Sequence, residues 1–299
     1  MVPALFFFYF YASLVNDVRS SIARYDLAAA ERQAKVYEAQ SGATAELAAA
    51  LSWIARGELD AGNFDRADSY AGETRKLAHQ LLHATSLDSD PWLPIALGAS
   101  IEVHAQALAA RGERPEAMAF LRKQLHLFGA TSLHERIQKN LNLLNLEGKP
   151  APPLEIDDWL GPRPVPLAAM RGRPVLLFFW AHWCGDCKGE VTILANLLRT
   201  YGSKGLVLIG PTRLYGYAAQ GEEATPAAEK QYIERVRRQY YSLLTDMPVP
   251  LSAANFLAYG SSTTPTLVLL DSAGIVRFYH PGAISERELS AHIQAVLRK

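Results

Sequence analysis

Cysteine is nearly absent from this chain, whose 299 residues contain only Cys184 and Cys187. Two thiols cannot form a four-cysteine zinc site, and no pair of histidines at ligand spacing follows them. A bridge between such close neighbours closes almost no loop and adds little stability, which excludes a structural disulfide framework. The pair therefore indicates reactive thiol chemistry, and the lack of any other cysteine suits an oxidising compartment.

Net charge is absent as well, because 30 Lys and Arg balance 30 Asp and Glu. This balance gives no electrostatic reason to expect a nucleic acid or an anionic membrane surface as a partner. Hydrophobic residues make up 49% of the chain and charged residues 20%, as in ordinary globular proteins. The length is sufficient for about two domains.

A long hydrophobic run is also missing. The apolar run at the N-terminus, Ala4–Val15, is shorter than the ~20 residues that span a bilayer, and no Lys or Arg precedes it. Its length matches the apolar region of a signal peptide, and small residues stand near its end. We interpret residues 1–17 as a signal or anchor remnant and predict an exported, periplasmic or membrane-tethered bacterial protein. The alternatives are a buried first helix and a cytoplasmic location.

Residues 18–147 contain few prolines and few strand signals, and their apolar residues recur at the spacing of amphipathic helices. Segments 51–74 and 101–124 resemble each other, each with a glycine in a turn, an alanine five positions later and then an aromatic residue. This pattern resembles the tetratricopeptide helix–turn–helix. It predicts an all-α, helical-repeat-like domain that offers a surface to a partner protein, with an unrelated helical bundle as the alternative.

A proline-rich segment, Gly148–Pro153, marks a domain boundary, since prolines end helices and stiffen linkers. Strands then alternate with helices over residues 148–299, which predicts an α/β fold. The expected strands are 175–179, 206–209, 266–270 and 275–278, and the expected helices are 187–201, 227–244 and a last one capped by Ser285.

The two cysteines lie where a buried strand ends and a helix begins. The unpaired N–H groups and the dipole of the helix N-terminus stabilise an anion. We therefore expect Cys184 to react as a thiolate nucleophile. Cys187, one helical turn later, is placed to resolve the mixed disulfide that Cys184 forms with a substrate.

Four features resemble the TlpA/ResA family of bacterial thiol–disulfide oxidoreductases, within the thioredoxin fold. These are the opening linker 148–152, the lead-in Arg171–Pro174, the motif Phe179–Cys187 and the acidic Glu190 three residues after the second cysteine. The resemblance covers about half of the chain. It implies a thioredoxin fold, protein dithiol and disulfide substrates, a membrane or periplasmic electron donor, and no cofactor or metal besides the redox-active disulfide.

The resemblance also implies further site residues. Thr264-Pro265 resembles the family's cis-proline loop, which would face the cysteines and pair with a substrate backbone, whereas the ordinary alternative is a trans proline that opens a strand. Trp183 is a candidate substrate contact. Glu190 is a candidate catalytic proton handler, because burial near the thiols would raise the pKa of its carboxyl, although a solvated glutamate is the alternative.

Gly185 and Asp186 depart from the usual proline-containing pair between the cysteines and are candidate redox-tuning residues. A negative charge beside the reactive sulfur disfavours the thiolate and hence the reduced form. We therefore expect a reduction potential nearer about −270 mV than about −120 mV. Asp186 has little effect if it points into water. We interpret His182 as a turn residue rather than a catalytic group.

Three rival functions remain at this point. The chain could be a helical-repeat adaptor whose thioredoxin-like domain mainly binds protein. A peroxiredoxin shares the fold, but no Pro-x-x-x-Thr segment precedes Cys184. A metal chaperone would be served only weakly by two thiols. The segment 211–250, longer than a minimal thioredoxin needs, is either a packed amphipathic insert or a docking element.

Overall fold

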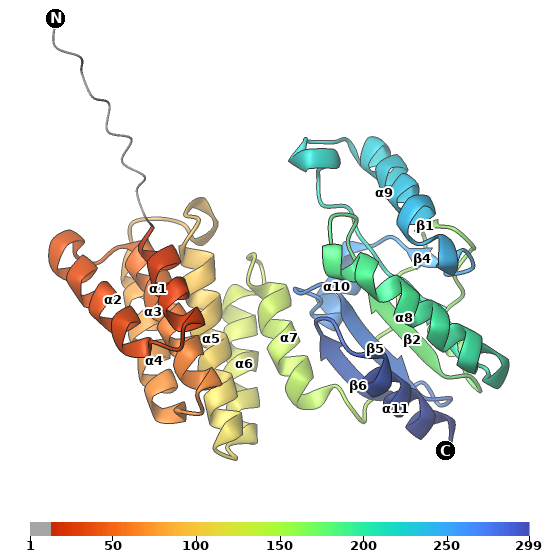
Figure 1. Cartoon of the computed structure of the whole chain (residues 1–299), viewed down its shortest axis with the longest axis horizontal. Helices are drawn as coiled ribbons and strands as arrows, with labels where there is room; N and C mark the ends of the chain where they lie inside the picture. Colours follow the sequence, from red (N-terminus) through yellow and green to blue (C-terminus); the bar gives the residue numbers. More distant parts are fainter. Residues whose placement is uncertain (1–12, 299) are drawn as a thin grey trace, which may run out of the picture. The chain divides into compact units, whose positions relative to one another are not determined.

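The computed structural model describes residues 13–298 and divides the chain into two compact units, the first ending at Leu133 and the second beginning at His134 (Figure 1). Most of the predicted signal or anchor segment, residues 1–17, lies outside the described residues. Its last residues form the start of helix α1, and Leu14 and Val15 are buried in the core of the first unit. The end of the apolar run therefore packs as a helix in the folded core.

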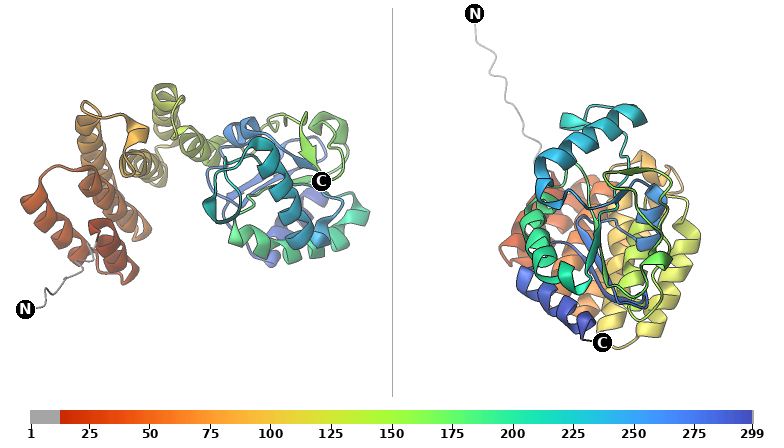
Figure 2. Two further views of the ribbon diagram at one scale, coloured as in Figure 1. Left: turned by 90° about the horizontal axis from the view of Figure 1, so that it is seen from above. Right: turned by 90° about the vertical axis from the view of Figure 1, so that its right-hand side faces the viewer.

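The first unit is built from helices joined by short turns, which confirms the predicted all-α part. Consecutive helices lie side by side (Figure 1, Figure 2). The α-helices are α1 (Leu14–Ala23), α2 (Leu27–Ser41), α3 (Ala45–Asp60), α4 (Phe64–Leu81), α5 (Leu93–Ala110) and α6 (Arg114–Phe128), with a short 3-10 helix η1 (Leu87–Ser89) before α5.

The two similar sequence segments form equivalent helical hairpins, α3–α4 and α5–α6. Gly62 and Gly112 occupy their turns with φ of 78° and 88°, values that L side chains rarely adopt. Ala67 and Ala117, five positions later, are fully buried where the paired helices approach each other. The hairpins account for the sequence similarity, while the tetratricopeptide class itself stays a prediction.

Among residues 13–298, one helix, α5, is long and apolar enough to cross a membrane. More than half of its apolar window is buried inside the protein, as in a helix at the centre of a folded unit. Its composition therefore follows from its place in the core.

The second unit contains a four-stranded sheet with the order β3-β2-β5-β6. Strand β2 runs parallel to β3 and antiparallel to β5, and β6 is antiparallel to β5. The strands are β2 (Val175–Phe179), β3 (Val207–Ile209), β5 (Thr266–Leu270) and β6 (Val276–Pro281); a separate pair joins β1 (Trp159–Leu160) to β4 (Val249–Pro250). This arrangement is the thioredoxin fold that the sequence predicts.

Helices cover both faces of this sheet, so its central strand is buried on both sides. Leu176 and Phe178 of β2 pack toward α8 (Gly185–Tyr201) and α11 (Glu286–Leu297). The other residues of the strand, Val175, Leu177 and Phe179, pack toward α10 (Ala253–Tyr259) on the opposite face. The five-residue apolar run is thus a buried strand in the middle layer of a three-layer structure. It ends just before the cysteine motif.

The boundary between the units differs from the predicted one between residues 147 and 148. Helix α7 (His134–Asn145) lies before the proline cluster, yet it packs on α10 and β6 and belongs to the second unit. Leu146, just after α7, is buried against the same face of the sheet. The thioredoxin-fold unit therefore includes an N-terminal helix that the linker composition did not indicate.

The insert after β3 is a packed amphipathic element, with one helix, α9 (Pro226–Tyr240), between the 3-10 helices η4 (Ala219–Gly221) and η5 (Ser242–Leu244). Ile233 and Val236 are buried, as the predicted helix 227–244 required. Tyr240 and Leu243 are 44% and 64% exposed, because α9 ends at Tyr240 and the chain turns away. The short 3-10 helix η2 (Leu167–Met170) precedes β2, and η3 (Gly202–Lys204) precedes β3.

The packing of α10 on α7 predicts a large cost for a side chain at Gly260. This residue has φ of 60°, and a Cβ atom there would lie 2.3 Å from the backbone nitrogen of Lys139 in α7. We expect Gly260→Ala to lower the free energy of unfolding by about 3 kcal/mol, through overpacking and the left-handed backbone together.

Gly274→Ala is the matched control, since Gly274 has φ of 74° and open space around it. It should cost only about 1 kcal/mol. Urea denaturation of both variants measures the difference, and equal midpoints would show that α7 does not pack on α10 as described.

Candidate active site

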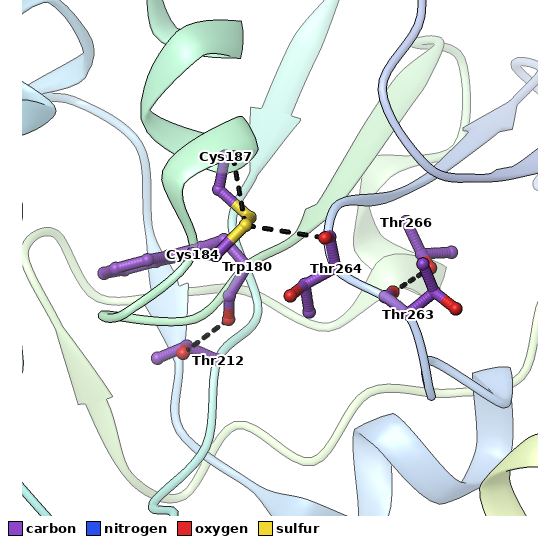
Figure 3. Close-up of a disulfide and its surroundings, with 7 residues drawn as sticks. All are labelled: Trp180, Cys184, Cys187, Thr212, Thr263, Thr264 and Thr266. Atoms are coloured by element: carbon purple, nitrogen blue, oxygen red, sulfur yellow. Dashed lines mark hydrogen bonds between the residues drawn. A yellow bond between two sulfur atoms is a disulfide. The ribbon is translucent and has the colours of Figure 1, made fainter. Parts of the chain in front are cut away.

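The turn that leads from β2 to the cysteines is fixed by Trp180. Its side chain is fully buried, and its indole N–H donates to the carbonyl oxygen of Gly210 at 2.9 Å. The hydroxyl of Thr212 donates to the carbonyl oxygen of Trp180 at 2.8 Å (Figure 3). These two hydrogen bonds connect the end of β2 to the segment after β3, so the chain enters the motif in one defined conformation.

Cys184 and Cys187 form a disulfide at the N-terminus of α8, where Cys184 is the N-cap residue. The backbone N–H of Cys187 donates to Cys184 Sγ at 3.0 Å, within the reach expected for a bond to sulfur. Cys184 keeps 3% of its surface exposed, whereas Cys187 is completely buried. The helix N-terminus is therefore directed at the first sulfur, and of the two cysteines only Cys184 has any accessible surface.

Thr264 lies opposite this sulfur (Figure 3), and Pro265 follows it in the chain. The peptide bond between them is cis, as the sequence predicts. Cys184 Sγ lies 3.5 Å from the carbonyl oxygen of Thr264, a contact in which the reduced thiol can donate a hydrogen bond. The carbonyl oxygen of Pro265 accepts the N–H of Gly282 at 2.7 Å and so joins this loop to the end of β6.

Trp183, Gly185 and Asp186 lie on the surface around the disulfide. Trp183 is 51% exposed, and its ring packs edge-on against Tyr215 with the centroids 5.5 Å apart. Gly185 and Asp186 are exposed in the first turn of α8. Water screens the carboxylate of Asp186, which limits its effect on the sulfurs.

Glu190 is buried one turn after Cys187, on the same helix. The N–H of Ile284 donates to Oε1 at 2.9 Å, while the buried Oε2 has no hydrogen-bond partner among residues 13–298. Burial raises the pKa of the carboxyl above its usual value, and the charge of Asp186 adds to this; the Ile284 bond and His280 act in the opposite direction. This is the environment that the sequence-based proposal for Glu190 required, rather than a solvated one.

His182 lies in a turn, as predicted, but it is buried, and sequence reasoning missed its partner. Its Nε2–H donates to the carbonyl oxygen of Tyr217 at 3.1 Å, and the same nitrogen lies 3.7 Å from Oε1 of Glu229. Burial lowers the pKa of the imidazole, partly opposed by the charge of Glu229. Glu229 precedes Ile233 by four positions, so its place on the buried stripe of the predicted helix was the available signal.

Within residues 13–298, no group of three or more His, Cys, Asp or Glu side chains is close enough to hold a metal ion. The sequence-based expectation of a site without metal or cofactor stays an expectation. What the geometry does provide is a disulfide held at a helix N-terminus, in which Cys184 keeps 3% of its surface accessible and Cys187 none.

A disulfide between neighbouring cysteines at the start of a helix, opposite a cis-proline loop on this sheet, defines a thioredoxin-fold thiol–disulfide oxidoreductase. The Redoxin family model matches residues 146–296, and the chain belongs to this family.

Curated relatives agree. The chain is 31% identical over 156 residues to the thiol:disulfide interchange protein DsbE of Xylella fastidiosa, covering 51% of this chain and 70% of that protein. It is 25% identical over 149 residues to the thiol-disulfide oxidoreductase ResA of Bacillus thuringiensis, covering 50% and 78%. These matches confirm the resemblance to the TlpA/ResA family.

Among solved structures, a DsbE-type thiol:disulfide interchange protein from Chlorobium tepidum is 23% identical, with a TM-score of 0.41. The similarity covers 50% of this chain and 97% of that one.

The buried carboxyl of Glu190 predicts a pH-dependent stability. Because its folded-state pKa is raised above the usual 4.5, the folded protein holds this proton more tightly than the unfolded chain does. Stability is therefore lost as the pH rises from about 4.5 through the folded-state pKa. Glu190→Gln, which carries no proton to lose, should show a smaller decrease over this range. Urea midpoints of the oxidised proteins between pH 4 and 8 measure it, and parallel curves would contradict it.

The position of Asp186 predicts a small effect on the redox equilibrium. Removing its negative charge favours the thiolate and hence the reduced form, so Asp186→Asn should shift the reduction potential to less negative values. Because the carboxylate is exposed, we expect a shift of no more than about 30 mV. Equilibration with glutathione or dithiothreitol buffers measures the potential. A shift to more negative values would contradict the assumption that the negative charge of Asp186 disfavours the Cys184 thiolate.

Proposed function

We propose that this protein reduces disulfides of exported proteins, with Cys184 as the nucleophile. The observation that carries the proposal is the asymmetry of the pair: the sulfur of Cys184 accepts the N–H of Cys187 and Cys184 keeps 3% of its surface accessible, while Cys187 is completely buried. A thiolate at the first position is stabilised by the helix N-terminus and is the one that a substrate can reach.

In the proposed reaction, the Cys184 thiolate attacks one sulfur of a substrate disulfide. A mixed disulfide forms, and the other substrate sulfur leaves as a thiolate that takes up a proton. Cys187 then loses its proton and attacks Cys184 Sγ, which breaks the mixed disulfide and releases the second substrate thiolate. Two electrons pass to the substrate, and the Cys184–Cys187 disulfide remains. This scheme needs no cofactor besides the cysteine pair.

Glu190 is proposed as the group that handles the proton of Cys187. It is buried on the same helix, its pKa is raised by burial, and its Oε2 has no partner in the oxidised protein. A carboxyl group whose pKa is raised is a stronger base than an ordinary carboxylate, which suits a group that takes and returns a proton. The carbonyl of Thr264 and the ring of Trp183 flank Cys184 and are proposed to contact the substrate polypeptide.

The same cycle requires an external dithiol that returns two electrons to Cys184–Cys187. We propose a donor in the membrane or periplasm and an exported location, which fits a chain with no cysteine outside the pair. The helical unit is proposed to bind a partner protein, supported by its paired hairpins α3–α4 and α5–α6.

Insulin reduction with dithiothreitol tests the proposed function. Cys184→Ser should abolish the protein-dependent rate, because no nucleophile remains. Cys187→Ser should also prevent turnover, and after pre-reduction and removal of dithiothreitol it should accumulate mixed disulfides with insulin on Cys184, seen as a mass increase that added thiol reductants remove. Wild-type protein without cysteine-dependent turnover would leave only a binding role for this domain.

A further inference from the structure

A second buried carboxylate, Glu229 in the insert, has no place in the mechanism above. Its side chain is completely inaccessible to solvent. It accepts the backbone N–H of Tyr215 at 2.6 Å with Oε1 and that of Gly216 at 2.8 Å with Oε2. A buried charge is costly unless it is hydrogen-bonded, so these two bonds indicate a carboxylate kept to hold this turn of the chain.

The turn that Glu229 holds forms one side of the active site. The ring of Tyr215 packs edge-on against Trp183, the exposed residue just before Cys184. The guanidinium of Arg213 lies over the Tyr215 ring, 4.9 Å from its centroid, and pairs with Glu135 of α7. Tyr215 is thus fixed through its backbone by Glu229 and through its ring by Arg213.

His182 joins the same turn to the cysteine motif from the other side. Its imidazole stacks on Tyr215, with ring centroids 5.6 Å apart, and lies 5.4 Å from the ring centroids of Tyr217 and Tyr232. Its Nε2–H donates to the carbonyl oxygen of Tyr217. His182 is two residues before Cys184, so these contacts join the 215–217 turn to the segment that leads into the cysteine motif.

We propose that Glu229 is a positioning residue that sets the aromatic wall of Tyr215 and Trp183, and that this wall binds apolar side chains flanking a disulfide in a protein substrate. The inference rests on the proposed function, because it assumes that protein disulfides react at Cys184. It assigns the insert a role in substrate recognition, acting through the 215–217 turn and without contact between Glu229 and the reacting sulfurs.

Glu229→Gln is the direct test. The amide keeps the size of the side chain but can accept only one of the two backbone N–H groups, so the turn loses a hydrogen bond. In single turnovers of the pre-reduced protein, we expect the half-saturating concentration of insulin to rise about tenfold. The limiting rate at saturating insulin, and the rate constant with oxidised glutathione, should stay within about twofold, because the cysteine chemistry is untouched.

Glu222→Gln is the matched control, since it makes the same chemical change at an exposed position of the same insert and should leave every constant unchanged. Tyr215→Leu is the second variant, in case Glu229→Gln does not fold. It keeps the backbone N–H and an apolar side chain but removes the ring that faces Trp183, and it should raise the half-saturating concentration by a similar factor. The double variant should be no worse than the poorer single one, because both act on one wall.

The outcomes separate the two proposals. Active wild-type protein with unchanged insulin saturation in either single variant, or with equal losses toward insulin and oxidised glutathione, overturns the positioning role alone. Fully additive effects in the double variant overturn it too. Wild-type protein that reduces neither disulfide overturns the proposed function, and the inference with it.

Discussion

The chemistry of this protein depends on one hydrogen bond, from the backbone N–H of Cys187 to the sulfur of Cys184. It exists because β2 ends just before the motif and α8 begins with Cys184 as its N-cap. An N-cap acceptor satisfies an N–H group that the helix leaves unpaired, and here the acceptor is the sulfur that we propose as the nucleophile. The same hydrogen bond therefore stabilises the start of α8 and would stabilise a thiolate at Cys184.

The thioredoxin-fold unit contains the buried glutamates Glu190 on α8 and Glu229 on α9, and their hydrogen bonds distinguish their proposed roles. Both offset the cost of burial by accepting backbone N–H groups, Glu190 from Ile284 and Glu229 from Tyr215 and Gly216. Glu229 has a partner for each oxygen, which suits a group that holds a turn. Glu190 keeps one buried oxygen without a partner, which suits a group that gains and loses a proton.

The thioredoxin-fold unit includes helix α7, which lies before the proline-rich segment Gly148–Pro153. It packs on α10, and its Glu135 pairs with Arg213, whose guanidinium covers the ring of Tyr215. The helix that precedes the proline linker is therefore connected to the side of the site where Trp183 is exposed. The helical hairpins of the first unit, by contrast, form a separate core made largely of small residues such as Ala67 and Ala117.

The main strands and the helix at the cysteines could be predicted from local signals, a five-residue apolar strand followed by two thiols one turn apart. The cis Thr264-Pro265 bond was implied by the resemblance to the TlpA/ResA family, and the sequence left open whether Glu190 is buried or solvated. The place of α7 in the second unit and the 3.7 Å distance between His182 and Glu229 could not be predicted. Linker composition does not reveal what a helix packs against. A glutamate on a helical stripe also gives no sign of the backbone N–H groups that a distant turn brings to it.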